Sequence, residues 1–362
     1  MDPLLLGAIV GATLIFLLLI GIPVAFCLGI TAMIFIAIDE GFGGFSVLAE
    51  TLFGSLDEFA LLSIPMFLLM GSAIAASRAG SDLYEAIDRW LYKVPGGLLI
   101  SNIGACGIFA ALTGSSPATC AAIGKMGIPE MVDRGYPPSL ATGAIAAGGT
   151  LGILIPPSIT MIVYGIATET SIGRLFMAGM LPGLMLVVLF MIWGWVFAYA
   201  KGYRFTEADK HFSFKEKLAI LPKIIPFMAV IAMVLWALYG GVATPSEASG
   251  VGALFCILLV MIIYRVWQPK SLWEIVRSAT RESVMLLMII GMAALFSYMM
   301  SSLYITQGIA EWIVSLDVNK WVLLLFINLF LLVAGFFLPP VAVILMTVPT
   351  LVPIIIAAGF DP

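Results

Sequence analysis

Charge and histidine are scarce in this chain of 362 residues. Asp, Glu, Lys and Arg together make up 10% of the residues. Soluble domains carry about 25%, so a water-facing globular surface is excluded. The balance of 17 basic to 21 acidic residues leaves no excess of positive charge, which excludes a typical nucleic-acid-binding protein.

The groups that most enzymes use are also scarce. The one histidine, His211, lies in a polar, basic stretch, and no pair of acidic residues or zinc motif falls within an apolar segment. The four cysteines have no disulfide or metal-ligand spacing. We therefore predict a protein that is not an enzyme, with no catalytic residue and no cofactor.

Long apolar runs fill most of the chain, which is 62% hydrophobic. Runs near 20 residues long recur, enough for a helix to cross the ~30 Å hydrocarbon core. The sequence therefore predicts an all-α polytopic membrane protein in a lipid bilayer. Leu4–Ile38 is too long for one crossing and breaks at Gly21-Ile22-Pro23, which predicts two helices. Further spans are expected over Phe59–Ser77, Ala141–Ile166, Leu175–Ala200, Leu218–Tyr239, Ala248–Tyr264 and Val284–Ser302.

Polar stretches between these runs predict the orientation. Residues 39–58 form an expected loop with five acidic residues and no Lys or Arg, whereas 201–217 and 265–281 are expected to be basic loops. Basic loops favour the cytoplasm, so 39–58 and the N-terminus are predicted to be periplasmic. The amphipathic stretch 78–93 is expected to lie in the membrane interface, with Asp82 on its polar face.

Glycine and proline interrupt two of the apolar segments. Gly114-Ser115-Ser116-Pro117-Ala118-Thr119 precedes an arm that carries Lys125 and is too short to cross, which predicts a re-entrant hairpin over 96–132. The next span is broken at Gly148-Gly149-Thr150 and again at Pro156-Pro157-Ser158. A freed carbonyl in hydrocarbon costs several kcal/mol unless it is coordinated. Broken helices of this kind are typical of secondary transporters.

An internal repeat relates the two ends of the chain. Ile128–Pro138 and Val352–Pro362 share a proline, a glycine, an aromatic residue and a final proline at one constant offset. The order of span, interfacial helix and hairpin also recurs, with a second break at Leu338-Pro339-Pro340. The loop assignments place the two hairpins on opposite sides of the membrane. The pattern predicts inverted repeats with two re-entrant hairpins and broken helices. The second repeat has no counterpart of the broken span, so we expect a truncated chain.

These patterns predict four segments. They are N-terminal scaffold helices over 1–58, a first repeat transport unit over 59–175, scaffold helices and cytoplasmic loops over 176–283, and a truncated second repeat transport unit over 284–362.

Four motifs together resemble the large membrane subunit, DctM, of tripartite ATP-independent periplasmic (TRAP) transporters. They are Gly21–Phe26, Gly114–Gly124, Ile155–Ser158 with Tyr164-Gly165, and Ala243–Ala248. The resemblance implies sodium-driven import of an organic acid and an elevator-type transport domain in the bacterial inner membrane. It also implies a small four-helix membrane subunit and a periplasmic substrate-binding protein as partners.

Sodium prefers several oxygen ligands, commonly carbonyls and hydroxyls, and the breaks supply both. We predict that sodium is bound by Gly114, Ser115, Ser116, Gly149, Thr150, Gly335 and Pro339. We predict that the substrate carboxylate contacts Pro117, Thr119, Pro156, Pro157, Ser158 and Pro340, near the N-terminal end of the second hairpin arm.

Each motif also has a purely structural interpretation. The serine pair fits interhelical hydrogen bonding, Gly148-Gly149 fits close helix packing, Pro156-Pro157 fits a kink, and Lys125 fits snorkelling to the interface. A membrane scaffold without transport and a truncated, inactive permease fragment are alternatives to the transporter. C4-dicarboxylates, sugar acids and keto acids all stay open as substrates, as do the number of sodium ions and the oligomeric state.

Overall fold

A computed structural model describes residues 2–91, 94, 96–201, 213–315 and 319–360. His211 and most of the predicted basic loop 201–217 lie outside the described residues, and so does Pro362 at the end of the repeat. The described part is helical, with short 3-10 turns and no strand. Four of its helices, α10, α12, α13 and α14, are long and apolar enough to cross a membrane, and five shorter helices are also apolar. The predicted all-α fold with several apolar helices is confirmed.

The chain divides into two compact units. One comprises residues up to Leu61, Val163–Thr170 and the chain from Ser283 onward, and the other comprises Leu62–Ile162 and Ser171–Glu282. The boundaries near 61 and 282 lie close to the predicted segment ends at 58 and 283. The transport and scaffold roles of the four segments stay predictions.

The first unit contains the two ends of the chain. Its core is apolar, with Leu28, Phe35 and Met299 among its buried side chains. Its elements are α1 (Pro3–Leu19), α2 (Val24–Asp39), η1 (Gly41–Phe45), α3 (Ser46–Leu56), the C-terminal part of α14 (Pro269–Ser302), α15 (Ile305–Ser315), α16 (Lys320–Phe337) and α17 (Pro340–Ala357).

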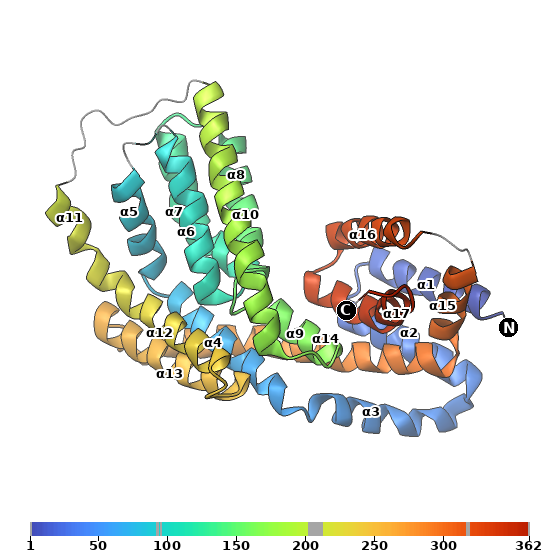
Figure 1. Cartoon of the computed structure of the whole chain (residues 1–362). Coiled ribbons are helices and arrows are strands. Elements are labelled where there is room, and N and C mark those ends of the chain that lie inside the picture. Colours follow the sequence, from blue (N-terminus) through green and yellow to red (C-terminus); the bar gives the residue numbers. More distant parts are fainter. Residues whose placement is uncertain (1, 92–93, 95, 202–212, 316–318, 361–362) are drawn as a thin grey trace. The chain divides into compact units, whose positions relative to one another are not determined.

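The second unit holds the first predicted hairpin. Helices α6, α7, α8 and α10 run side by side (Figure 1), and α4 packs extensively on α13. The elements are α4 (Ser63–Ala75), α5 (Ala79–Leu91), α6 (Gly97–Thr113), α7 (Ser116–Asp133), α8 (Pro138–Thr150), η3 (Leu151–Ile153), α10 (Ile172–Ala200), α11 (Phe214–Ala219), α12 (Leu221–Tyr239), α13 (Pro245–Tyr264) and the first part of α14. Two elements, η2 (Phe59–Leu62) and α9 (Ile159–Ala167), cross the unit boundaries.

Two segments predicted as loops are helical. Residues 46–56 form α3, because Leu48, Leu52 and Leu56 recur every fourth residue, and the last two face Gly291 of α14. Residues 269–281 form the start of α14. There Ile275 and Ala279 are buried four residues apart, while the basic side chains are exposed. In both cases the charged residues led to the prediction of a loop, although the apolar residues recur with the period of a helix.

The two copies of the predicted repeat end their helices, α7 and α17, with the same backbone geometry. Helix α7 ends in a left-handed Gly135, with the Tyr136 amide donating to the Met131 carbonyl at 3.0 Å. Helix α17 ends in a left-handed Gly359, with the Phe360 amide donating to the Ile355 carbonyl at 3.1 Å. This six-residue closure needs the left-handed residue that glycine supplies. The matched glycines are therefore equivalent helix ends, whereas the inverted topology stays a prediction.

The amphipathic helix α5 packs inside the second unit through both of its faces. Asp82, predicted on a water-facing side, is buried and accepts from Lys223 Nζ at 3.2 Å and from Tyr264 Oη at 3.0 Å. Arg89 donates to the Glu216 carbonyl at 2.7 Å. The assignment of Asp82 to a solvated face was wrong, because α12 and α13 supply partners that the sequence of α5 does not reveal.

Replacing Asp82 by alanine should destabilise this unit. The change leaves the Tyr264 hydroxyl without its acceptor, and an unpaired buried polar group costs about 1–3 kcal/mol. Asp82→Asn keeps an acceptor and should lose less. Thermal unfolding in detergent would measure the order. Glu85→Ala is the matched control, because Glu85 pairs with Arg89 on an exposed part of α5, where such pairs contribute about 0–1 kcal/mol. Equal losses for Asp82→Ala and Glu85→Ala would contradict the expectation.

Candidate functional site

The tip of the first hairpin is a tight turn between α6 and α7. Gly114 has a left-handed backbone with φ 60°, and Ser115 is extended. The Gly114 amide closes α6 on the Ala110 carbonyl at 2.8 Å. Pro117 lies in the first turn of α7, where its missing amide hydrogen leaves no intrahelical bond unmade. The two helices α6 and α7 therefore pack as a helical hairpin, whereas its re-entrant position in the membrane stays a prediction.

Two buried threonines hold this turn from inside. Thr119 Oγ1 donates to the Ser115 carbonyl at 2.9 Å, and Thr113 Oγ1 donates to the Phe109 carbonyl at 3.1 Å. The two hydroxyl oxygens lie 3.2 Å apart. The Thr119 hydroxyl, which was predicted to contact the substrate, therefore already has hydrogen-bond partners within the tip.

The break in the next span begins later than predicted. Gly148, Gly149 and Thr150 are the last turn of α8, and the chain leaves the α-helix only at Leu151. The segment that follows contains buried Pro156 and Pro157, joined by a cis peptide bond. Ser158, fully buried, donates through Oγ to the Ile153 carbonyl at 2.6 Å. The unwound residues are therefore 151–158, with Ser158 satisfying one of the freed carbonyls.

The hairpin tip rests directly on this break through backbone atoms. A Cβ on Gly114 would lie 2.5 Å from the Pro157 carbonyl oxygen. A Cβ on Gly152 would lie 2.8 Å from both the Ser115 carbonyl carbon and the Ser116 nitrogen. Glycine at 114 and 152 is what lets the two interrupted helices meet, so the predicted pairing of tip and break is present.

The glycines at the end of α8 pack closely against the hairpin. A Cβ on Gly148 would lie 2.7 Å from Cys106 Cβ, and one on Gly149 would lie 2.0 Å from Cys120 Sγ. The packing interpretation of this pair therefore has direct geometric support. If Gly149 binds an ion as predicted, its carbonyl oxygen has to do so from within the last turn of α8, because this turn is not unwound.

The predicted hydroxyl ligands differ in their surroundings. Ser116 Oγ is buried and has no hydrogen-bond partner among the described residues. Ser115 is half-buried at the tip, next to a cavity. Thr150 is exposed, and its hydroxyl donates to the Ala147 carbonyl at 2.7 Å. A buried polar group without a hydrogen-bond partner needs an explanation, and Ser116 Oγ is such a group.

The predicted ligands of the second hairpin lie in the other compact unit. Leu338 and Pro339 form the extended turn between α16 and α17, and Pro340 is the first residue of α17. Gly335, Pro339 and Pro340 are exposed, and nothing lies within 4 Å of a Cβ built on Gly335. This tip offers carbonyls but no hydroxyl. Its predicted roles in binding stay predictions.

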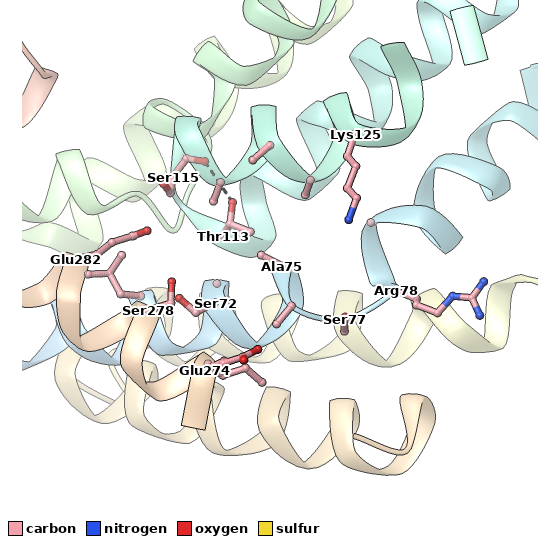
Figure 2. Close-up of a pocket in the computed structure, with 18 of the residues that line it drawn as sticks. Ser72, Ala75, Ser77, Arg78, Thr113, Ser115, Lys125, Glu274, Ser278 and Glu282 are labelled. Atoms are coloured by element: carbon pink, nitrogen blue, oxygen red, sulfur yellow. Dashed lines mark hydrogen bonds between the residues drawn. The ribbon is translucent and has the colours of Figure 1, made fainter. Parts of the chain in front are cut away.

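A cavity of about 630 Å³ opens beside the first hairpin tip (Figure 2). Thr113 and Ser115 line it at the tip, and small side chains of α4 and α7 line it further along. One stripe of α14, Glu274, Ser278 and Glu282, also lines the cavity. Sequence reasoning missed this stripe because it assigned residues 265–281 to a loop. The spacing of the three residues, four apart, is the signal that would have placed them on one helical face.

Charges at the base of the hairpin join α7 to α5. Arg134 makes an ion pair with Glu130 in α7 and lies 3.8 Å from the Asp88 carboxylate in α5. Burial, together with the nearby Asp88 and Glu130 carboxylates, raises the pKa of Tyr84. The hairpin is therefore fixed at its base as well as at its tip.

Within the described residues, no three His, Cys, Asp or Glu side chains gather as metal ligands. The oxygen atoms that the first tip itself offers to a cation are those of hydroxyls and carbonyls. Those are the ligands that a singly charged hard cation accepts.

Residues 12–362 match the family model described as "Tripartite ATP-independent periplasmic transporter, DctM component". A C4-dicarboxylate TRAP transporter large permease protein of Pseudomonas aeruginosa is 38% identical over 315 residues, which are 87% of this chain and 73% of that protein. An isethionate TRAP transporter permease protein, DctMQ, of Oleidesulfovibrio alaskensis is 33% identical over 95% of this chain and 54% of its own length. A sialic acid TRAP transporter large permease protein of Vibrio cholerae is 30% identical over 96% of this chain and 80% of that protein.

Proposed function

Because this chain belongs to the DctM family, the large permease subunits of TRAP transporters, we propose that it imports an organic acid in symport with sodium. It is a multi-pass membrane protein and a transport protein, not an enzyme. In this proposal it lies in the inner membrane with a periplasmic N-terminus. It receives substrate from a periplasmic binding protein and works with a small membrane subunit. The relative named DctMQ supports a permease that acts with a second component.

The observation that carries the proposal is the contact between the first hairpin tip and the broken span. Gly114 lies against Pro157 and Gly152 against Ser115, so two interrupted helices bring their free backbone groups together. Such paired breaks supply ion and substrate ligands in secondary transporters. The buried, unpartnered Ser116 Oγ supplies an oxygen without a competing hydrogen bond.

The substrate class in this proposal is an organic acid. Relatives are named for C4-dicarboxylates, isethionate, sialic acid and ectoine, so their names do not narrow the acid further. In the proposal, the acid group lies near the start of α7, whose first amides can donate to an anion. Movement of the hairpin unit as an elevator is part of the same proposal.

Sodium coupling is tested by uptake into proteoliposomes that contain the full transporter with its partner subunits. An imposed sodium gradient should drive uptake of the acid, and a potassium gradient should not. Ser116→Ala should raise the sodium concentration for half-maximal uptake roughly tenfold to a hundredfold, because an interaction with a charged group contributes about 1.5–3 kcal/mol.

Thr142→Ala is the matched control for this substitution. Thr142 is also in this unit, but its hydroxyl is exposed and donates within its own helix to the Pro138 carbonyl at 2.9 Å. Ser115→Ala and Thr150→Ala test the other two predicted hydroxyls. If Ser116→Ala and Thr142→Ala show the same sodium dependence as the unmodified chain, Ser116 is a packing residue. Uptake without any sodium dependence would refute the coupling itself.

A further inference from the structure

The cavity beside the hairpin tip owes its volume to small side chains. On α7, Ala118, Ala121 and Ala122 line it at helical spacing, and on α4 it is lined by Gly71 and Ser72. Helix packing normally fills such space with larger apolar residues. With about 630 Å³, the cavity is within the range of about 300–1,000 Å³ that is typical of small-molecule sites.

Charged groups of both signs face this space. Lys125 extends from α7 on one side, while Glu274 and Glu282 lie on α14 on the other (Figure 2). The guanidinium of Arg78 is directed away from them. Among the residues that the structure describes, Lys125, Glu274 and Glu282 make no ion pair with one another or with any other side chain. Arg78 also lines the cavity, so two cations and two carboxylates border it, and Lys125 is the cation that is not directed away from the glutamates.

The distribution of these charges decides between ligand classes. A dicarboxylate would bring two negative charges into a cavity that already has two carboxylates, and of its two cations Arg78 directs its guanidinium away from them. A monocarboxylate that also carries a cationic nitrogen can place its acid group near Lys125 and the tip hydroxyls, and its nitrogen near the glutamates. Opposite charges attract and like charges repel by comparable amounts at equal distance, so the second arrangement is favoured.

We infer that this cavity binds a compact zwitterion, a carboxylate with a cationic nitrogen, and that Lys125 contacts its acid group while Glu274 and Glu282 contact its nitrogen. The inference rests on the proposed function, in that the cavity adjoins the tip that is proposed to bind the transported acid. It extends that proposal by naming the class of acid.

Equilibrium binding to the purified full-length transporter, in potassium salt without sodium, tests the inference. Three probes separate the charges: glycine betaine as the zwitterion, 3,3-dimethylbutanoate as the same shape without the positive nitrogen, and succinate as the dianion. Glycine betaine should bind at least tenfold more tightly than either of the other two.

Substitutions then separate the contact to the cationic nitrogen from the contact to the acid group. Glu274→Gln and Glu282→Gln should each weaken betaine binding at least threefold and leave dimethylbutanoate binding unchanged. Lys125→Gln should weaken both. Glu50→Gln, an exposed carboxylate on α3 in the other unit, is the control and should change neither. Each variant is first checked for an unchanged melting temperature.

Two results would overturn the inference. One is tighter binding of succinate than of betaine, with further tightening in Glu274→Gln or Glu282→Gln. The other is failure of betaine to bind to a preparation that takes up another organic acid with sodium, which leaves the proposed function in place. Betaine binding with the predicted pattern, but without sodium-driven uptake of any acid, would instead refute the proposed function and leave this site standing.

Discussion

Alanine at position 114 is expected to abolish uptake and to destabilise the hairpin unit. Gly114 has φ 60°, and a left-handed backbone costs an alanine roughly 1–2 kcal/mol. Its Cβ would also lie 2.5 Å from the Pro157 carbonyl oxygen, which belongs to backbone and cannot rotate away. The tip would have to separate from the break, and overpacking of this kind costs roughly 1–3 kcal/mol more.

Two glycines in the same unit separate these causes. Gly241 has φ 64° and open space around a built Cβ, so Gly241→Ala tests the left-handed conformation alone. Gly143 is helical and also has open space, so Gly143→Ala tests neither cause and should be as stable as the unmodified chain or more so. The melting temperatures should therefore decrease in the order 143, 241, 114.

Uptake distinguishes the role of the contact from its contribution to stability. Gly241→Ala should retain sodium-driven uptake in proportion to folded protein, whereas Gly114→Ala should lose it even in the folded fraction. An active Gly114→Ala variant would mean that the transporter works without contact between tip and break. The contact between the hairpin tip and the broken span would then no longer support the proposed function.

Local backbone signals in the sequence predicted the parts of this site that depend on them. Gly114 and Pro117 marked the hairpin turn, and the repeated Pro-Gly-aromatic pattern marked two equivalent helix ends at Gly135 and Gly359. These positions are recognisable because few other residues tolerate their conformations. The break after α8 was found for the same reason, although Gly148 and Gly149 drew the prediction a few residues too early.

Features that depend on a partner from elsewhere in the chain were missed. Asp82 looks like a water-facing residue on the helical wheel of α5, and only the approach of Lys223 and Tyr264 buries it. Glu274 was assigned to a loop because basic residues surround it, and Glu282 fell between that loop, 265–281, and the span predicted from Val284. The charged residues of this segment were interpreted as exposed to water. Glu274 and Glu282 instead line the cavity beside the hairpin.

The packing of α8 against the hairpin predicts that a second substitution can restore the stability lost in the first. Gly149→Ala should destabilise the unit by roughly 1–3 kcal/mol, because its Cβ would lie 2.0 Å from Cys120 Sγ. Cys120→Ala removes that sulfur. The next contacts of the new Cβ, Cys120 Cβ and the Ser116 carbonyl oxygen, are both at 3.5 Å, an ordinary separation. The double variant should therefore regain most of the stability, with a coupling energy on the order of 1–3 kcal/mol between the two sites.

The neighbouring glycine is the matched control, because the same rescue should fail there. A Cβ on Gly148 would lie 2.7 Å from Cys106 Cβ, an atom that Cys106→Ala retains. Gly148→Ala with Cys106→Ala should thus stay as unstable as Gly148→Ala alone. Thermal unfolding of the four single and two double variants in detergent, together with sodium-driven uptake, would measure the coupling in both pairs.

The outcome also bears on how Gly149 acts in transport. If Gly149 serves only to leave space for Cys120, the rescued double variant should recover uptake with an unchanged sodium requirement, since the carbonyl of residue 149 is still present. Rescue of stability without recovery of uptake would mean that Gly149 needs freedom to unwind during transport, as the sequence first indicated. Failure of rescue in the Gly149 pair would mean that the close approach of Gly149 to Cys120 does not limit stability, and the packing interpretation of Gly149 would have to be abandoned.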